Sequence, residues 1–483
     1  MPRLIKAVPP LLYVAITATL ALVLFNLFFK AEDKSLLLPG GTTHGHYQIE
    51  LQCDACHTDE KRENVFTSSG VPNSACTACH GEDLTKFSDS HPVRKFRNPE
   101  NAIFLEHIDA MSCVACHTEH NQKVTNEMAV TVPNDYCAHC HEVTLENLES
   151  HKDLTYDSCA TAGCHNYHDN IALAPSFLLK HFGEPEIMPE PQTPQTDALA
   201  RWFEEGNKER EALKAGDHDG PPDSDPETVR RWAESAHAMA GINCSSCHDS
   251  GSSWIDVPEW DSCNSCHGFE SESFLKGKHG MRLAHKSLSP MTPAMARQPM
   301  KADAAHRELD CSACHQPHDY NRHYASYEAC IQCHDDEHTR QYENSAHFRL
   351  WSAELDGGEA RSGVSCATCH MPSVPHDGHH AINHDQTANL TPNEKMLQSV
   401  CMHCHGLQFS MDALADESLI QNNFASRPTK RHPGISWTVD SAVRRNKTKI
   451  IELKQWLEDN PGKSRFDMPE ESPPASDNNT DKE

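Results

Sequence analysis

The sequence is short of apolar side chains for a chain of its length. Hydrophobic residues make up 37% of the 483 residues, and that share already includes all 22 cysteines. The mean hydropathy is −0.65. A chain this polar has little apolar surface with which to build an ordinary core. We therefore expect other apolar material to contribute to packing, together with short helices and much irregular backbone.

Basic side chains are also scarce. The chain has 42 lysines and arginines against 70 acidic residues, a net charge of −28 with neutral histidines. Binding to nucleic acid requires a basic surface. We therefore expect no nucleic-acid partner. An acidic surface favours solubility and basic partners, but it does not identify one.

No cysteine stands outside a pair. Two of them, Cys159 and Cys164, are separated by four residues and are followed by His165. The other twenty form ten copies of Cys-x-x-Cys-His: Cys53/Cys56/His57, Cys76/Cys79/His80, Cys113/Cys116/His117, Cys137/Cys140/His141, Cys244/Cys247/His248, Cys263/Cys266/His267, Cys311/Cys314/His315, Cys330/Cys333/His334, Cys366/Cys369/His370 and Cys401/Cys404/His405.

This motif is the attachment signal of c-type haem. The two sulfurs form thioether bonds to the porphyrin, and the next residue supplies the proximal imidazole to the iron. Zinc ribbons and thioredoxin-like sites also use Cys-x-x-Cys pairs, but they do not require histidine at the same offset in every copy. The pattern predicts a covalent haem c at each motif. These haems would supply the missing apolar material.

The pair in "SCATAGCHNYH" allows three interpretations: a disulfide, a haem with a specialised catalytic role, or one more ordinary attachment site. A disulfide between Cys159 and Cys164 would give His165 no reason to follow. Gly163 can relax the backbone where a longer loop must still present both sulfurs. We interpret this segment as one more attachment site, which predicts eleven haems.

The amino terminus carries a long uncharged stretch. Residues 11–29 contain no charge, and Arg3 and Lys6 precede them. A run of nineteen uncharged, mostly apolar residues is enough to span a bilayer, and basic residues mark the cytoplasmic end. A cleaved signal peptide would have a shorter apolar region and a small-x-small cleavage site. We expect a signal anchor at residues 1–34, with a transmembrane helix at about 10–29. The haem domains would then lie in the periplasm, attached to a bacterial inner membrane.

The motifs fall into two blocks on either side of a segment without cysteine. We expect a mainly α fold with much irregular chain, in which two multihaem domains pack around covalent haems, plus one N-terminal transmembrane helix. The expected parts are a pentahaem domain at 40–182, an acidic proline-rich linker at 183–230 with a helix near 197–214, a hexahaem domain at 231–432, a C-terminal helix at 433–461 and a disordered acidic tail at 462–483.

Two of the expected helices have readable signals. Asp225 can cap the helix that opens the second block, Pro226 suits its first turn, and Gly241 can end it. The C-terminal helix has an apolar stripe of Val443, Ile450, Leu453, Trp456 and Leu457.

Histidines outnumber the motifs. Eleven of the 35 are proximal, which leaves 24. His139 and His403 lie inside Cys-x-x-Cys loops, and His218 lies in the linker, so these three are poorly placed as distal ligands. Further candidates are His44 or His46, His91, His107, His151, His181, His237, His279, His306, His347, His384, His376, His379 and His380.

Four candidates have local support. His120, His168 and His318 each follow a proximal histidine by three residues, and His338 follows His334 by four. On a helical turn these offsets place both imidazoles on one face. One ring would bind its own haem, and the other would reach the iron of a neighbouring haem. The alternative is a histidine that is solvated or bonded to a haem propionate.

One stretch of the sequence, which we call the basic window, is positively charged although the chain as a whole is acidic. Residues 273–302 contain no acidic residue, two histidines (His279 and His285) and six basic residues: Lys276, Lys278, Arg282, Lys286, Arg297 and Lys301. Such a window could attract an anion to an open haem nearby. The alternative is that it neutralises haem propionates or contacts an acidic partner.

The phrases "CIQCHDDEH", "SAHFRLW", "GVSCATCHMP" and "NLTPNEKMLQSVCMHCHGL" lie within residues 231–425. This region resembles the superfamily of hydroxylamine oxidoreductase and octahaem tetrathionate reductase. The resemblance implies a helical fold with stacked and angled haem pairs, and some members act on nitrogen or sulfur compounds. The chain departs from the catalytic members because it has six motifs here instead of eight and no Cys-x-x-Cys-Lys.

Residues 40–182, with "CHTEH", resemble class III and pentahaem electron-transfer cytochromes. In class III cytochromes the four-residue loop carries ordinary haems, which agrees with the interpretation of Cys159 and Cys164. We therefore expect an undecahaem electron carrier whose redox partners are a quinol dehydrogenase or a terminal reductase. The alternative is a terminal oxidoreductase for nitrite, hydroxylamine or tetrathionate at one open haem in the second domain. Whether the chain is an enzyme stays open at this stage.

Overall fold

The structure is a computed structural model. The residues that it describes are 10–29, 35–58, 71–86, 91–106, 109–122, 129–141, 147, 167–169, 173–191, 193–194, 211–249, 251, 253–316, 318–319, 321–358, 361–390 and 393–469. The segment with Cys159, Cys164 and His165 lies outside these residues, as do His107, His151 and most of the expected helix near 197–214.

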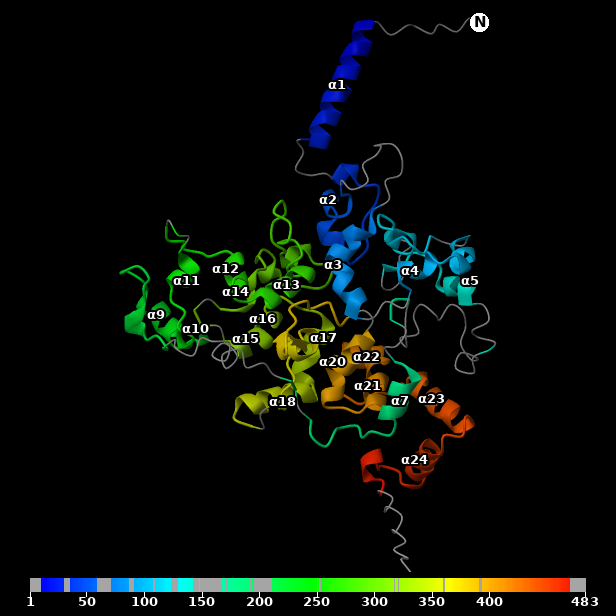
Figure 1. The fold of residues 1–483 in the computed structure, drawn as a ribbon. Helices are drawn as coiled ribbons and strands as arrows, with labels where there is room; N and C mark the ends of the chain where they lie inside the picture. The colour runs from blue at the N-terminus through cyan, green and yellow to red at the C-terminus, as the bar shows by residue number, and fades with distance from the viewer. Residues whose placement is uncertain are drawn as a thin grey trace, which may run out of the picture. The chain divides into compact units, whose positions relative to one another are not determined.

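The backbone is mainly helical, with short elements separated by irregular chain (Figure 1). The prediction of a mainly α fold with much irregular backbone is confirmed. The α-helices are α1 (Pro10–Phe29), α2 (Cys53–Cys56), α3 (Asn73–Lys86), α4 (Val93–Phe96), α5 (Ala138–His141), α7 (Pro175–His181), α9 (Pro226–Ala233), α10 (Ala236–Met239), α11 (Ser245–His248), α12 (Asp261–Asn264), α13 (Gly268–Lys276), α14 (Cys311–Cys314), α15 (Arg322–Ser326), α16 (Glu328–Ile331), α17 (Glu337–Gln341), α18 (Ala346–Leu355), α19 (Cys366–His370), α20 (Met396–Ser399), α21 (Leu407–Leu414), α22 (Glu417–Gln421), α23 (Pro433–Arg444) and α24 (Thr448–Asp459).

The chain divides into two compact units. Unit 1 combines Met1–Glu82 with Phe96–Val132, and unit 2 combines Asp83–Lys95 with Pro133–Glu483. The motifs that begin at Cys53, Cys76 and Cys113 therefore belong to unit 1. The motif that begins at Cys137 belongs to unit 2, together with the whole second block.

The structure does not show the expected transmembrane helix among the described residues. The chain is helical over α1, but no helix in the described part of the chain is long and apolar enough to cross a membrane.

The helix expected at the start of the second block is broken in two. Asp225 accepts a hydrogen bond from the Thr228 amide and Pro226 occupies the first turn of α9, as expected from the sequence. The Ser235 hydroxyl then accepts a bond from the Ala238 amide and starts α10. A serine that bonds the backbone in this way begins a new helix, so the expectation of one continuous helix was wrong.

The single C-terminal helix expected at 433–461 was also wrong. Asn446 has φ of 57° between α23 and α24. Asparagine tolerates this left-handed conformation, which reverses the chain and lets two helices pack where the apolar stripe indicated one. The following residues 463–469 are also ordered, since the Arg465 amide donates to the Gly183 carbonyl at 2.6 Å. The expectation of disorder is therefore wrong for residues 463–469, and residues 470–483 lie outside the described residues.

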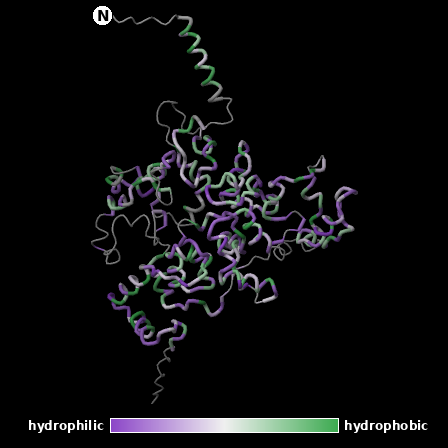
Figure 2. The backbone as a smooth tube through the Cα atoms, turned by 180° about the vertical axis from the view of Figure 1, so that it is seen from behind, coloured by the Kyte–Doolittle hydropathy of each residue, from purple (hydrophilic) through white to green (hydrophobic). Residues whose placement is uncertain are grey.

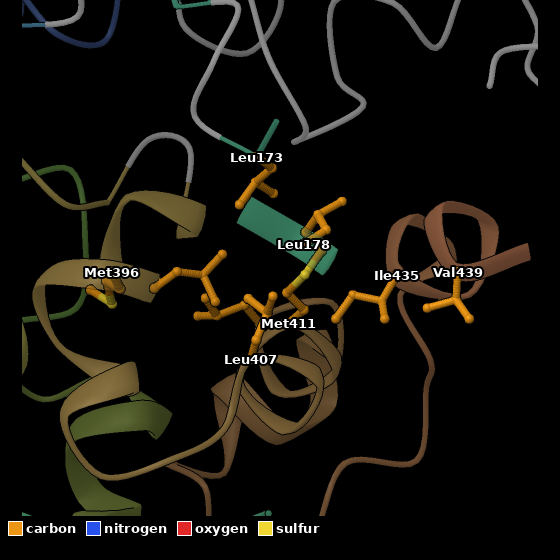
Figure 3. Close-up of a cluster of buried hydrophobic side chains, with 9 residues drawn as sticks. Leu173, Leu178, Met396, Leu407, Met411, Ile435 and Val439 are labelled. Carbon is orange, nitrogen blue, oxygen red and sulfur yellow. The ribbon is translucent and has the colours of Figure 1, made fainter. Parts of the chain in front are cut away.

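Outside α1, which is hydrophobic over most of its length, apolar residues are scattered in short stretches along hydrophilic chain (Figure 2). The largest buried apolar cluster lies in unit 2, where α7, α20, α21 and α23 meet (Figure 3). Its members are Leu173, Leu178, Met396, Leu397, Leu407, Met411, Leu414, Ile435 and Val439. A smaller cluster joins Tyr327, Tyr342 and Trp351. These clusters are small for the size of the unit, which agrees with the low apolar content of the sequence.

A two-stranded antiparallel sheet is formed by β1 (Ser373–His376) and β2 (His379–Ile382). Asp377 and Gly378, with φ of 45° and 80°, form the turn. An Asp-Gly pair in the left-handed region is the usual two-residue hairpin turn.

Replacing Leu407 by alanine is expected to destabilise unit 2 by about 2–5 kcal/mol, because a fully buried leucine leaves a cavity. Leu407 is 0% exposed at the centre of the cluster in Figure 3. The measurement is chemical unfolding of the haem-bearing protein followed by circular dichroism. Leu350→Ala is the matched control, since Leu350 is 44% exposed and its loss should cost little. Equal costs for the two variants would contradict this prediction.

Candidate haem-binding sites

Most motifs fold as one tight turn. In seven of them the amide of the histidine donates to the carbonyl of the first cysteine at 2.8–3.0 Å: His57, His117, His248, His267, His315, His334 and His405. This bond closes one helical turn over the five residues. The turn holds the two sulfurs and the imidazole close together.

Some turns are also capped from outside. The Asp310 carboxylate accepts bonds from the Ser312 and Ala313 amides at the start of α14. The Ser365 hydroxyl does the same for the Thr368 amide in α19. Such caps hold the motif in its turn before any cofactor chemistry takes place.

Cys79 differs from most of the predicted attachment cysteines in its setting. Its motif is not a short separate turn but the middle of α3, a helix of 14 residues. The Cys79 side chain is exposed, whereas most of the described cysteines are at least partly buried. Burial raises the pKa of Cys56, and Glu119 and the Cys79 thiol raise it further, so Cys79 lies near the first motif. The protein therefore does not enclose this sulfur, and the attachment of haem to Cys79 stays a prediction.

Cys116 lies at the end of a 3-10 turn, as Cys404 does in its own motif. It follows a 3-10 turn at Cys113–Ala115, and its amide donates to the Cys113 carbonyl at 3.2 Å. The Cys116 carbonyl accepts two bonds from Thr131, from the amide at 2.8 Å and from the hydroxyl at 2.9 Å. Thr131 thus holds the backbone of this motif from a distant part of the chain. The Cys116 side chain is partly buried, and its attachment to haem likewise stays a prediction.

The main finding is a set of imidazole pairs. Nine proximal histidines each face a second histidine, and the ring centres are 5.8–6.5 Å apart. The pairs, with the proximal residue first, are His57–His120, His80–His46, His141–His91, His248–His318, His267–His237, His315–His384, His334–His279, His370–His338 and His405–His347.

This spacing fits an iron held between two imidazoles. An iron–nitrogen bond of about 2 Å on each side, plus about 1 Å from nitrogen to ring centre, gives roughly 6 Å between centres. The residues present therefore fit a bis-histidine haem. The His248–His318 pair also borders a cavity lined by Cys244, Trp232 and Trp254.

In six of the nine pairs, a hydrogen bond to a backbone carbonyl orients one of the two rings. A backbone carbonyl accepts a bond from Nδ1 of each of these ligand candidates at 2.5–3.0 Å: His91 (Tyr167), His120 (Gly40), His248 (Ile255), His338 (Ile420), His384 (Ile382) and His405 (Glu186). Because a carbonyl only accepts, the proton must be on Nδ1. Nε2 is then left as the free electron pair that a metal requires.

Burial keeps the rings neutral. It lowers the pKa of His237, His279, His315, His347 and His370 to about 4, and facing histidines lower it further. A protonated imidazole cannot bind iron, so a low pKa makes a ring ready to act as a ligand at neutral pH.

Successive motifs lie next to each other in the order of the chain. Thiol contacts join Cys76 with Cys113 in unit 1 and, in unit 2, Cys263 with Cys311 and Cys330 with Cys366. These contacts raise the pKa of Cys76, Cys311 and Cys330.

Weaker charge effects between cysteine thiols show that the remaining successive motifs of the second block are also close together. Burial raises the pKa of Cys247, and the thiols of Cys263 and Cys266 raise it further. Burial likewise raises the pKa of Cys314 and Cys369 to about 12, with added effects from the thiols of the next motif along the chain. Thioether formation would remove these thiols, but their adjacency remains. The six motifs from Cys244 to His405 thus form one continuous row.

The structure places three of the four locally supported histidines opposite motifs other than their own. His120 faces His57, His318 faces His248, and His338 faces His370. The expected helical turn is wrong for two of them, because His120 and His318 have φ of 61° and 68°. The chain leaves the helix after the proximal histidine, and this left-handed residue turns the second ring away. His168 packs edge-on against Tyr167, with ring centres 5.2 Å apart.

The other sequence candidates divide into two groups. His46, His91, His237, His279, His347 and His384 each face a proximal histidine. His44 packs against Tyr47, His181 bonds Glu184, and His376 packs against His379 across the hairpin. The histidine that would face His117 is not identified. Nδ1 of His117 donates to the Ala129 carbonyl at 3.1 Å.

The basic window is largely engaged with its own surroundings. The Lys276 ammonium pairs with Glu272 at 3.0 Å, and the Arg282 guanidinium donates to the Ser289 carbonyl at 2.8 Å. Burial lowers the pKa of Lys278, and Asp385 opposes that shift. His279 faces His334, so the ring at the centre of the window is placed as a ligand, not beside an open iron. The geometry gives the anion-binding interpretation no support here.

Neither a disulfide nor a zinc scaffold fits the described residues. All twenty cysteines that the structure describes are free thiols. Over the same residues, no group of three or more metal-binding side chains gathers around one point. Structural zinc needs four such ligands.

One functional residue was missed from the sequence. Glu119 accepts a hydrogen bond from His46 Nδ1 at 2.6 Å, so it lies directly behind a ligand candidate. The signal was present in "CHTEH", where an acidic residue stands between two predicted ligands. Its role depended on the fold bringing residue 46 beside residue 119.

These features define a multihaem c-type cytochrome: repeated attachment turns, paired imidazoles and no competing metal or disulfide scaffold among the described residues. Comparison with known families supports this class. Residues 45–142 and 236–335 each match the cytochrome c3 family. That family implies covalently bound c-type haems and electron transfer. No solved structure matches the chain. The resemblance of residues 231–425 to the hydroxylamine oxidoreductase superfamily stays a prediction.

Proposed function

We propose that this chain is an undecahaem electron carrier in which most irons are held by two histidines. The observation that carries this proposal is that every motif histidine of the second block is paired with a second histidine. All six of its proximal histidines, from His248 to His405, face another imidazole. A catalytic haem needs a free position for its substrate, whereas a carrier does not.

The residues of the chain have separate tasks in this proposal. Cysteine sulfurs would hold each haem covalently, and paired imidazoles would hold its iron. Backbone carbonyls fix the orientation of the rings, and burial keeps them neutral. Haem c supplies reversible one-electron chemistry when bound.

The order of the motifs supports transfer over distance. Among the three motifs of unit 1 and the six motifs of the second block, neighbours in the sequence are neighbours in space, as the contacts of Cys76 with Cys113 and of Cys330 with Cys366 show. A row of adjacent one-electron sites suits conduction along the chain. An isolated catalytic site would not require such a row.

Location and partners rest on the sequence alone. The uncharged residues 11–29 after Arg3 and Lys6 motivate a membrane anchor, with the haem regions in the periplasm. An anchored protein would be close to a quinol dehydrogenase as electron donor and could pass electrons to a terminal reductase. Detection of the full-length chain in the soluble periplasmic fraction would contradict the anchor.

The test is the spin state of every haem in the purified full-length protein. Electron paramagnetic resonance and optical spectra are expected to show low-spin iron only. Carbon monoxide and nitrite are expected to leave the spectra unchanged. A stoichiometric high-spin signal that nitrite or hydroxylamine perturbs would instead favour the terminal oxidoreductase.

A further inference from the structure

The His46 ring differs from the other oriented ligand candidates in what it bonds. Six of the paired rings donate Nδ1 to a neutral backbone carbonyl. His46 donates instead to the Glu119 carboxylate, with 2.6 Å between Nδ1 and Oε1. Its ring centre is 6.0 Å from that of His80.

The carboxylate is held in place by a second residue. Thr43 donates its amide to Glu119 Oε2 at 2.7 Å and its hydroxyl to Oε1 at 2.8 Å. Thr43 is completely buried, and the Glu119 side chain is only 21% exposed. Burial raises the pKa of Glu119, but the bonds from His46 and Thr43 outweigh it and keep the group ionised.

The same turn also orients a second ligand candidate. His120 follows Glu119 directly and donates Nδ1 to the Gly40 carbonyl at 3.0 Å. A side chain at Gly40 would clash, because a Cβ there would lie 2.4 Å from the His120 carbonyl oxygen. Residues 40–46 therefore wrap around the turn at 117–120, and the Glu119 carboxylate accepts hydrogen bonds from His46 and Thr43.

We propose that Glu119 sets the reduction potential of the iron held by His46 and His80, lowering it relative to sites whose histidine bonds a carbonyl. A carboxylate behind the ring makes imidazole a stronger electron donor and stabilises the more positive ferric iron. The effect needs no movement of the proton, which stays on Nδ1. This inference rests on the proposed bis-histidine haems.

The test is a spectroscopically monitored redox titration of the full-length haem-bearing protein and its Glu119→Gln variant. One low-spin haem is expected to become easier to reduce by about tenfold in its equilibrium constant, which corresponds to about 59 mV for one electron. The other midpoints, the haem count and the low-spin spectra are expected to stay unchanged. A titration identical to that of the parent, with all haems still present and low-spin, would overturn the proposal.

Two further variants separate potential from structure. Glu184→Gln is the matched control, because Glu184 accepts from His181 Nδ1 at the same 2.6 Å but His181 faces none of the described proximal histidines. It is expected to move no midpoint, and a shift equal to that of Glu119→Gln would count against the assignment. In a His46→Met background, Glu119→Gln is expected to have no additional effect on potential.

The outcomes also separate this inference from the proposed function. A high-spin signal in the parent would contradict the bis-histidine carrier itself. Loss of one low-spin haem in Glu119→Gln would show that Glu119 only positions His46, which overturns the potential-setting role and leaves the carrier intact.

Discussion

Replacing His347 by alanine is expected to convert one haem of the purified protein from low-spin to high-spin iron. His347 lies in α18 and its ring centre is 6.2 Å from that of His405. Burial lowers the pKa of His347 to about 4, so the ring is neutral and available to iron. Alanine preserves the helix but removes this ligand. The expected change is the loss of about one eleventh of the low-spin signal and the appearance of one site that binds carbon monoxide.

The control for this variant is His285→Ala. His285 lies in the basic window, and in the described part of the chain it faces no proximal histidine. Its loss is expected to leave every haem low-spin. If His347→Ala also stays fully low-spin with an unchanged haem count, the assignment of His347 as a ligand is wrong.

Replacing both Cys159 and Cys164 by serine is expected to remove one haem from the protein. The pair precedes His165, and Gly163 gives the longer loop the freedom to present both sulfurs. Serine forms no thioether, so the intact mass is expected to fall from that of eleven attached haems to that of ten. Mass spectrometry of the denatured protein measures this directly.

The matched control uses a motif of ordinary spacing. Replacing Cys137 and Cys140 by serine is also expected to remove one haem. If the parent protein carries ten haems and the variant of Cys159 and Cys164 still carries ten, the segment "SCATAGCHNYH" is a disulfide loop or an unmodified pair.

Attachment could be predicted from the sequence because all of its chemistry is local. Two sulfurs and a histidine within five residues need only one turn of backbone, and His57, His117 and five other motif histidines show that turn. Ligand pairing is different. His315 faces His384, and nothing near either residue in the sequence indicates the other. Such pairs depend on how distant segments pack, which one-dimensional spacing does not encode.

The surroundings of each motif could not be predicted either. Cys79 and Cys116 belong to motifs with the same spacing, yet the first lies within the long helix α3 and the second after a 3-10 turn. The difference arises outside the motif, since Thr131 bonds the Cys116 carbonyl from fifteen residues further along the chain. The five-residue pattern contains no information about that contact.

Local spacing was also misleading where single residues broke a pattern. The apolar stripe through Val443 and Ile450 was continuous in sequence, but Asn446 reversed the chain between them. His120 and His318 kept their expected offset from a motif, yet reached their partners through a left-handed residue. Glu119 could be seen in "CHTEH", but its bond to His46 required a fold that joins two separate segments.

The pairing pattern also has a direction along the chain. In four of the six sites of the second block, the facing histidine precedes the motif in the sequence: His237 before His267, His279 before His334, His338 before His370 and His347 before His405. A nascent chain would thus already carry both imidazoles when each of these motifs emerges. His248 and His315 must wait for His318 and His384. Because the proposed location of the haem regions is the periplasm, ligand pairing would follow the order in which the chain emerges there, and the His315 site closes only after residue 384 has emerged.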